Sequence, residues 1–420
     1  MNRVKLGELL RIKHGYAFKS ENYVTSSPYA LVTLANISSS NSFRFDQEKT
    51  TFYGASFPEE FILHTDDLIM PLTEQVIGLF GNSAFIPSVK GIRFVLNQRV
   101  GKVIPNEGKA DKYYLHYLLS TETVRKQLEH RASGTKQRNI SPDDVYDVTV
   151  VVPELNVQQK IGQALYCIEA KVNVNNAIND NLQQQIKLMY DYWFNQFDFP
   201  NEDGKPYRSS GGKMQYSQCF KRNIPDGWTE ESVISNSIST PIKPGVEPFS
   251  TKIYLATADV NGARLSSGSL IDYETREGRA NMQPTVSSVW FAKMKNSIKH
   301  LFLNKEMESL IDSTVLSTGF CGLQCTNESF EYIAAFIEHS YFEDVKNTLA
   351  HGATQESVNN DDLLGLTMLV PTPAVLELFH AKARPLYAQI SQNICENQKL
   401  TEIRDWLLPM LMNGQATIRD

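Results

Sequence analysis

The 420-residue chain has little of several features that would place it in a familiar class. It has five cysteines, an odd number without the pair-of-pairs spacing of a zinc site, and this favours a reducing compartment. No apolar run approaches the length of a membrane span, and the charged residues near the amino terminus leave no apolar core for a signal peptide. We therefore expect a cytoplasmic protein.

The chain also lacks an excess of positive charge, because its 41 Lys and Arg residues are outnumbered by 47 Asp and Glu residues, which gives a formal net charge of -6. Chains that bind nucleic acid are usually basic, so this balance argues mildly against such a partner. Phosphate is attracted by local patches rather than by net charge, however, and each half of the chain has one basic cluster. The clusters are Arg125, Lys126, Arg131, Lys136 and Arg138, and Lys293, Lys295, Lys299, His300 and Lys305.

Catalytic motifs are missing as well. The sequence has no Gly-x-x-x-x-Gly-Lys-Ser/Thr phosphate loop, no glycine fingerprint after a strand and no Asn/Asp-Pro-Pro-Tyr/Phe tetrapeptide. Carboxylate pairs at 66–67, 143–144 and 361–362 are possible metal ligands, but the last two precede β-rich runs, where capping is the commoner role. We expect no catalytic residue, no metal and no cofactor.

The chain does contain one long helical pattern twice. Apolar residues spaced alternately four and three apart run from Ile161 to Trp193, with Asn175 and Asn179 in the middle. The pattern recurs 218 residues later, with Asn393 and Asn397 at the matching positions. One such stripe is common on surface helices, but the recurrence of both asparagines favours duplication of a larger unit.

The segments that flank the helices repeat too. Gly134–Gln137 matches Gly352–Gln355 at the same offset, and each is followed by an Asp-Asp pair and a β-rich run that ends in proline. Tyr29–Ile37 resembles the segment that ends at Val260, now at an offset of 223. The order is globule, helix, globule, helix, with boundaries at 1–153, 154–199, 200–371 and 372–420.

Strand-like and helix-like runs alternate within each globule, which predicts an α+β fold rich in β-structure. In the first globule we expect strands within 29–37, 61–70 and 94–104, a polar loop over 72–86 and one helix over 111–130. In the second we expect strands within 253–260 and 288–291, a basic turn over 293–300 and one helix over 330–349. The segment 199–212, rich in Pro, Gly and Ser, reads as the linker.

Duplication also predicts how the two long helices pair. Two copies joined by a short linker can place their helices side by side about an approximate two-fold axis only if the helices are antiparallel. Facing residues then have numbers that add up to 572, so Asn175 faces Asn397 and Asn179 faces Asn393. A buried amide favours an amide partner, which selects this register. Only Ile168 opposite Arg404 is mismatched.

Several of these features together resemble a known family. They are the order of globules and helices, Gly134–Gln137, Trp193-Phe194 followed by Phe197-Asp198-Phe199, Ile224-Pro225-Asp226-Gly227-Trp228, and the terminal run Arg404-Asp405-Trp406-Leu407-Leu408-Pro409-Met410-Leu411-Met412-Asn413-Gly414. The chain resembles, over nearly its whole length, the specificity subunit of type I restriction–modification systems.

The resemblance implies two pseudo-symmetric target recognition domains separated by an antiparallel coiled-coil spacer. Each domain would read one half of a bipartite double-stranded DNA target, and the helices would set the half-site spacing and dock two methyltransferase (modification) subunits. Methylation would reside in those subunits, and ATP-driven translocation and cleavage in restriction subunits. The chain itself would be no enzyme. The alternatives are a coiled-coil scaffold that binds protein partners and a nuclease or methyltransferase with an unrecognised site.

Side chains that read bases in the major groove offer paired hydrogen-bond donors and acceptors. Arg, Lys, Asn, Gln, Ser and Thr residues in the loops are therefore candidate DNA-binding residues. The candidates in the first globule are Thr73, Gln75, Gln98, Arg99, Lys136, Gln137 and Arg138. Those in the second are Lys293, Lys295, Asn296, Lys299, Thr354 and Gln355. Glu356 stands where the first globule has Arg138, so we expect the two loops to meet phosphate unequally.

Overall fold

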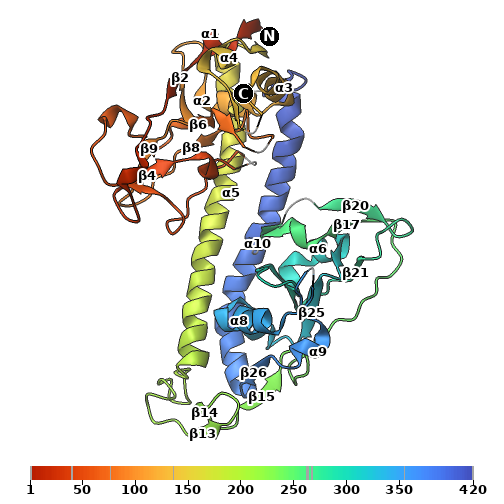
Figure 1. The fold of residues 1–420 in the computed structure, drawn as a ribbon. Coiled ribbons are helices and arrows are strands. Elements are labelled where there is room, and N and C mark those ends of the chain that lie inside the picture. The colour runs from red at the N-terminus through yellow and green to blue at the C-terminus, as the bar shows by residue number, and fades with distance from the viewer. Residues whose placement is uncertain are drawn as a thin grey trace. The chain divides into compact units, whose positions relative to one another are not determined.

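The structure, a computed structural model, describes residues 2–38, 41–75, 77–135, 137–261, 264–265, 268–353 and 355–418. It divides into two compact units, the first made of residues 1–170 and 401–420 and the second of residues 171–400. The two long helices, α5 (Leu155–Tyr190) and α10 (Pro373–Met412), each supply residues to both units (Figure 1).

The first unit holds a globule of small sheets. Two antiparallel pairs are β1 (Asn2–Lys5) with β12 (Thr149–Val152) and β7 (Thr73–Glu74) with β11 (Arg138–Asn139). A four-stranded sheet has the order β2 (Leu10–His14), β10 (Val100–Pro105), β6 (Leu68–Pro71), β8 (Ala84–Phe85). Another has the order β3 (Tyr23–Val24), β5 (Phe52–Tyr53), β4 (Tyr29–Val32), β9 (Arg93–Leu96), with β4 and β9 parallel.

The second unit repeats this plan. β15 (Thr229–Ser232) pairs with β26 (Thr367–Val370), and one four-stranded sheet has the order β16 (Ser239–Pro241), β25 (Phe320–Cys325), β22 (Ser288–Ala292), β23 (His300–Leu303). The other has the order β20 (Ser269–Asp272), β17 (Thr251–Leu255), β24 (Thr314–Ser317), β21 (Ala280–Met282), with β17 and β24 parallel. Two hairpins are added, β13 (Met214–Ser217) with β14 (Arg222–Pro225) and β18 (Val260–Asn261) with β19 (Arg264–Leu265).

Three short helices also recur. The first unit has α2 (Lys112–Leu119), α3 (Glu122–Arg131) and α4 (Pro142–Tyr146), and the second has α7 (Phe330–Glu338), α8 (Ser340–Leu349) and α9 (Asn360–Leu363) at the matching places. α1 (Leu6–Leu9), after β1, and α6 (Glu308–Ser313), between β23 and β24, occupy different places in the two units. The single helices predicted over 111–130 and 330–349 are therefore wrong, since each is two helices. Thr121 and His339 adopt extended backbone at the breaks and start the second helix.

Tight 3-10 turns follow the parallel strands at equivalent places. In η2 (Leu34–Asn36) the Asn36 side chain accepts from the Thr33 amide at 2.7 Å, and in η5 (Thr257–Asp259) the Asp259 carboxylate accepts from the Ala256 amide at 2.8 Å. The other 3-10 turns among the described residues are η1 (Ser20–Asn22), η3 (Glu59–Phe61) and η6 (Lys305–Met307), whereas η4 (Asp191–Asn195) is a π-helical turn that continues α5.

The Asp pairs that precede β12 and β26 act as caps, as predicted. Asp144 accepts from the Ser141 amide at 3.0 Å at the start of α4, and Asp362 accepts from the Asn359 amide at 2.7 Å at the start of α9. Each carboxylate satisfies a backbone donor that the helix leaves free.

The antiparallel register of the long helices is confirmed inside the second unit. The Asn175 amide donates to the Asn397 side-chain oxygen at 2.9 Å, and the Asn393 amide donates to Asn179 at 2.8 Å. The rings of Trp193 and Phe379, which the 572 sum also pairs, lie 5.6 Å apart between centroids. The amides find each other away from water, where an unpaired amide is costly.

The first unit contains the other end of the same seam. Ile161 and Leu165 share its hydrophobic core with Leu407 and Leu411. Arg404, opposite Ile168 in the predicted register, donates to the Asp405 carboxylate at 2.7 and 2.9 Å. It also acts on the mostly buried Glu169. Burial opposes the charged form, but His116 Nε2 at 3.4 Å, the Tyr117 hydroxyl, which donates at 2.9 Å, and the Arg404 charge lower the pKa of Glu169.

In the first unit the main hydrophobic core combines residues of the sheet β2-β10-β6-β8, the helices α2 and α3, and both long helices. In the second it combines the sheet β16-β25-β22-β23, the helices α7 and α8, and both long helices. Cys321 and Cys325 are buried in strand β25, which agrees with their reading as small core residues. Among the residues the structure describes, no helix combines the length and the apolar composition needed to cross a membrane.

Candidate nucleic-acid interface

Three loops distant in sequence meet at one edge of the first globule. The Leu72 amide donates to the Arg99 carbonyl at 2.9 Å, and the Ile140 amide donates to the Leu72 carbonyl at 3.0 Å. We call this edge the first junction and define it as Leu72–Gln75, Gln98–Arg99 and the described residues of Gly134–Ile140. The junction thus gathers all the described candidates of the first globule.

The second globule builds the same junction. The Lys293 amide donates to the Gly319 carbonyl at 3.0 Å, and the Val358 amide donates to the Lys293 carbonyl at 3.0 Å. We define the second junction as Lys293–Asn296, Thr318–Gly319 and the described residues of Gly352–Val358. Lys299, which follows the first of these loops in the same turn, completes the described candidates of the second globule.

Each junction contains one tight hairpin that requires glycine. Gly134 and Gly352 have φ values of +111° and +141°, a region that other residues avoid. A Cβ there would lie 2.2 Å from the Gln137 carbonyl oxygen in the first hairpin and 2.6 Å from that of Gln355 in the second. The repeated Gly-x-x-Gln motif is therefore a backbone turn that places its glutamine.

The first-junction candidates differ in exposure. Gln75, Gln98 and Arg99 are exposed and Gln137 is half-buried. Thr73 is buried, and its hydroxyl donates to the Asn139 side chain at 2.9 Å, so it supports the hairpin. Lys136 lies outside the described residues.

Arg138 is held by protein groups rather than turned outward. Its guanidinium lies 3.3 Å from the Glu74 carboxylate and donates to the Glu129 carbonyl at 2.7 Å. Glu74 is only 1% exposed, and its other carboxylate oxygen accepts from the amides of Leu79 and Phe80 at 3.0 and 3.2 Å. Sequence reasoning missed Glu74, although a single acidic residue in an otherwise uncharged loop was the available signal.

The second-junction lysines are likewise engaged. Lys295 forms an ion pair with Glu356 at 2.8 Å, and the Lys299 ammonium donates to the Thr257 carbonyl. Asn296 is exposed, and its backbone amide donates to the Asn347 side chain at 2.8 Å.

The remaining second-junction candidates are Gln355, Lys293 and Thr354. Gln355 is exposed and contacts the Met294 sulfur at 3.3 Å. Lys293 is half-buried, and Thr354 lies outside the described residues.

Arg279 is a second-globule residue that the sequence did not single out. Its carbonyl accepts from the Thr318 amide at 2.9 Å, which places the residue beside the second junction. Its side chain is exposed and forms no ion pair with a described residue. Thr318–Gly319 stands where the first junction has Gln98–Arg99, so each junction has one exposed guanidinium nearby, supplied by a different segment. No short-range pattern marks Arg279, since a strand pairing brings it there.

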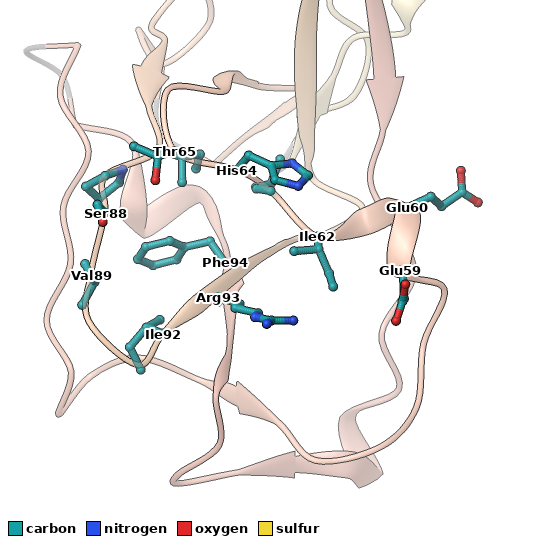
Figure 2. Close-up of a pocket in the computed structure, with 13 residues that line it drawn as sticks. Glu59, Glu60, Ile62, His64, Thr65, Ser88, Val89, Ile92, Arg93 and Phe94 are labelled. Atoms are coloured by element: carbon teal, nitrogen blue, oxygen red, sulfur yellow. The ribbon is translucent and has the colours of Figure 1, made fainter.

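A separate cavity of about 690 Å³ lies between the segments 59–65 and 86–94 of the first globule (Figure 2). Phe94 lies between the side chains of Thr65 and Ile92, and Glu59 and Glu60 point away from it (Figure 2). None of its lining residues belongs to the first junction. Within the described ranges, no group of three or more His, Cys, Asp or Glu residues gathers in a way that would hold a metal ion.

Comparison with known proteins gives these junctions a context. Residues 1–184 match the family model described as Type I restriction modification DNA specificity domain. The MjaIX specificity subunit of a type I restriction enzyme from Methanocaldococcus jannaschii is 22% identical over 342 residues, which cover 77% of this chain and 73% of the relative. The HindI specificity subunit from Haemophilus influenzae is 22% identical over 375 residues, 77% of this chain and 81% of that one.

The fold has a solved counterpart. The S subunit of a type I restriction–modification system from M. genitalium has a TM-score of 0.54 and 12% sequence identity, and the match covers 98% of this chain and 95% of that chain. Residues 1–184 thus match the DNA specificity domain of type I restriction–modification systems, and most of the chain is similar to specificity subunits of those systems.

Proposed function

We propose that each globule reads one half of a bipartite double-stranded DNA target through its junction. The observation that carries this proposal is the double occurrence of one backbone arrangement that presents different side chains. A protein that reads two different half-sites needs a common docking geometry and divergent contacts, because phosphate contacts position a protein and base contacts specify sequence.

Within each junction the exposed guanidinium and amide groups are our proposed readers. Arg99 and Arg279 suit the paired acceptors of guanine or a phosphate, and Gln75, Gln98 and Gln355 suit adenine. Asn296, Gln137 and Lys293 complete the DNA-facing set, and Lys136 and Thr354 belong to it on sequence grounds. Thr73, Arg138, Lys295 and Lys299, whose polar groups are engaged by other protein groups, become supports of this surface.

The proposed DNA recognition also suggests roles for the remaining parts of the chain. We infer target recognition domains at 1–153 and 200–371, with the helices over 154–199 and 372–420 setting the gap between half-sites. Those helices would dock two modification subunits, and restriction subunits would join the full complex. Methylation and cleavage would then reside in the partners, this chain would be non-catalytic, and it would work in the cytoplasm alongside the DNA.

The test is methylation-site mapping with this chain co-expressed with its modification subunit. We expect Arg99→Ala to relax one position in one half-site and Arg279→Ala to relax one in the other, each with a loss of about 1–3 kcal/mol of discrimination. Lys205→Ala, at an exposed position of the linker 199–212 and outside both junctions and both long helices, is the control. Loss of specificity in both halves from either substitution would refute the division of labour.

The scaffold alternative makes a different prediction. A scaffold that binds only protein would show no salt-dependent affinity for DNA, whereas phosphate contacts give affinity a steep salt slope. Binding of the purified subunit complex to DNA across a salt series separates the two.

A further inference from the structure

We infer that the two ion pairs Glu74–Arg138 and Lys295–Glu356 are equivalent positioning pairs, built with opposite polarity, that hold the hairpins of the two junctions in place. The inference rests on the proposed function for what the hairpins do. The pairs themselves touch neither base nor phosphate; they orient the neighbouring Gln137 and Gln355.

The equivalence comes from the backbone register. In the first junction Arg138 faces Glu74 and Asn139 faces Thr73 across the short antiparallel ladder. In the second, Ser357 faces Met294, and the Lys295 amide donates to the Glu356 carbonyl at 3.0 Å. Arg138 and Glu356 therefore occupy one position of the repeated hairpin, and Glu74 and Lys295 occupy the position opposite.

The charges at the hairpin position and at the opposing position are exchanged between the two junctions. The cation lies on the hairpin in the first junction, where the separation is 3.3 Å, and on the opposing strand in the second, where it is 2.8 Å. A phosphate-binding role would require a cation on the hairpin in both, but the second hairpin carries a carboxylate. Both junctions therefore have opposite charges across these two positions, but the sign of the charge on the hairpin differs between them.

The first pair has further contacts that fit a positioning role. The Glu74 carboxylate joins three segments at once, since it faces Arg138 and accepts from the amides of Leu79 and Phe80. It thereby fixes the hairpin and the loop that carries Gln75. The Lys295 and Glu356 side chains are more exposed, at 33% and 47%, so this pair stabilises its hairpin less.

The experiment reverses the second pair, which is accessible enough to be exchanged. Lys295→Glu, Glu356→Lys and the double variant are compared by methylation-site mapping in cells that also contain the modification subunit, and by thermal unfolding of the purified complex. The controls Lys205→Glu and Glu202→Lys make the same charge changes at exposed positions of the linker 199–212, outside both junctions and both long helices.

We expect each single reversal to reduce discrimination in the second half-site by about five-fold or more, which is what loss of roughly 1 kcal/mol produces, and to leave the first half unchanged. The double variant, which adopts the polarity of the first junction, should recover to within about two-fold of wild type. The control variants should select the wild-type site.

Three outcomes would overturn the inference. If the singles select the wild-type site, the pair does not position the hairpin. If the double variant stays as defective as Lys295→Glu, the lysine contacts DNA directly. If both half-sites change, the effect is on the whole fold. A wild-type complex that methylates no bipartite site would instead refute the proposed function. In that case the thermal unfolding data would still show whether the double variant restores the ion pair.

Discussion

Arg138 and Lys295 both face a carboxylate, yet their surroundings predict very different energies. Glu74 is buried and Glu356 is half exposed. A buried charge that loses its partner keeps its desolvation cost, whereas an exposed ion pair gains little because water screens it.

We expect Arg138→Ala to lower the free energy of unfolding by about 3 kcal/mol and Lys295→Ala by less than about 1 kcal/mol. Urea unfolding of both variants measures this. Equal losses would show that Glu74 is not a buried charge that depends on Arg138.

Glu338 offers a prediction about pH. It lies on α7, accepts from the Gln183 side chain at 3.4 Å, and burial raises its pKa to about 7. In the unfolded chain the carboxyl has its ordinary, lower pKa, so between these values the folded state holds the proton and the unfolded state does not. Stability is therefore fully present at low pH and falls as pH rises toward 7, by about 1–3 kcal/mol.

Glu338→Gln cannot ionise, so it should lack this fall and be more stable than wild type at pH 8. Urea unfolding at pH 5, 6, 7 and 8 gives the comparison, and other titrating groups cancel in the difference between the two proteins. A constant difference across the series would contradict the raised pKa.

At the scale of elements, the asparagine seam sets how α5 and α10 meet in the second unit. We expect Asn179→Leu to cost about 1–3 kcal/mol of unfolding free energy, because Asn393 would be left buried without its partner. Asn179→Leu with Asn393→Leu should recover most of that loss, since neither amide then lacks a bond. Urea unfolding of both singles and the double forms a double-mutant cycle, and additive losses would mean that the two amides act independently.

Much of the arrangement of helices and strands could be predicted from the sequence. The spacing of the seam and its duplication predicted both the helices and their register, since one symmetry fixes every facing pair. The breaks at Thr121 and His339 could not be predicted, because a single extended residue leaves the helical pattern almost unchanged. The repeat also identified the junction loops, but Arg99 and Arg138 look alike in sequence. The contact with Glu74, which only the structure shows, distinguishes Arg138 from the exposed Arg99. Arg279 reaches the second junction through a long-range strand pairing, which the sequence does not show.

At the scale of the whole molecule, helix length is the quantity to vary. α5 has 36 residues and α10 has 40. At a rise of about 1.5 Å per residue, each helix is longer than the roughly 34–36 Å that separates half-sites one DNA turn apart. We propose that a matched heptad added to both, after Ala170 and after Thr401, lengthens the unread gap by about three base pairs and alters neither half-site. Methylation mapping reads out the gap, and an unchanged gap would refute the spacer role.

The opposite polarity of the two ion pairs also constrains how the gene can change. The two halves encode similar segments, so one half is a ready template for copying over the other. A short copied tract that carried Glu356 into the position of Arg138 would set a second carboxylate against Glu74, and the reverse copy would set an arginine against Lys295. A tract that spans both partners, from Lys295 to Glu356, keeps a matched pair. We therefore expect exchange between the halves to be tolerated best in long tracts, which would carry a whole junction and its proposed DNA preference together.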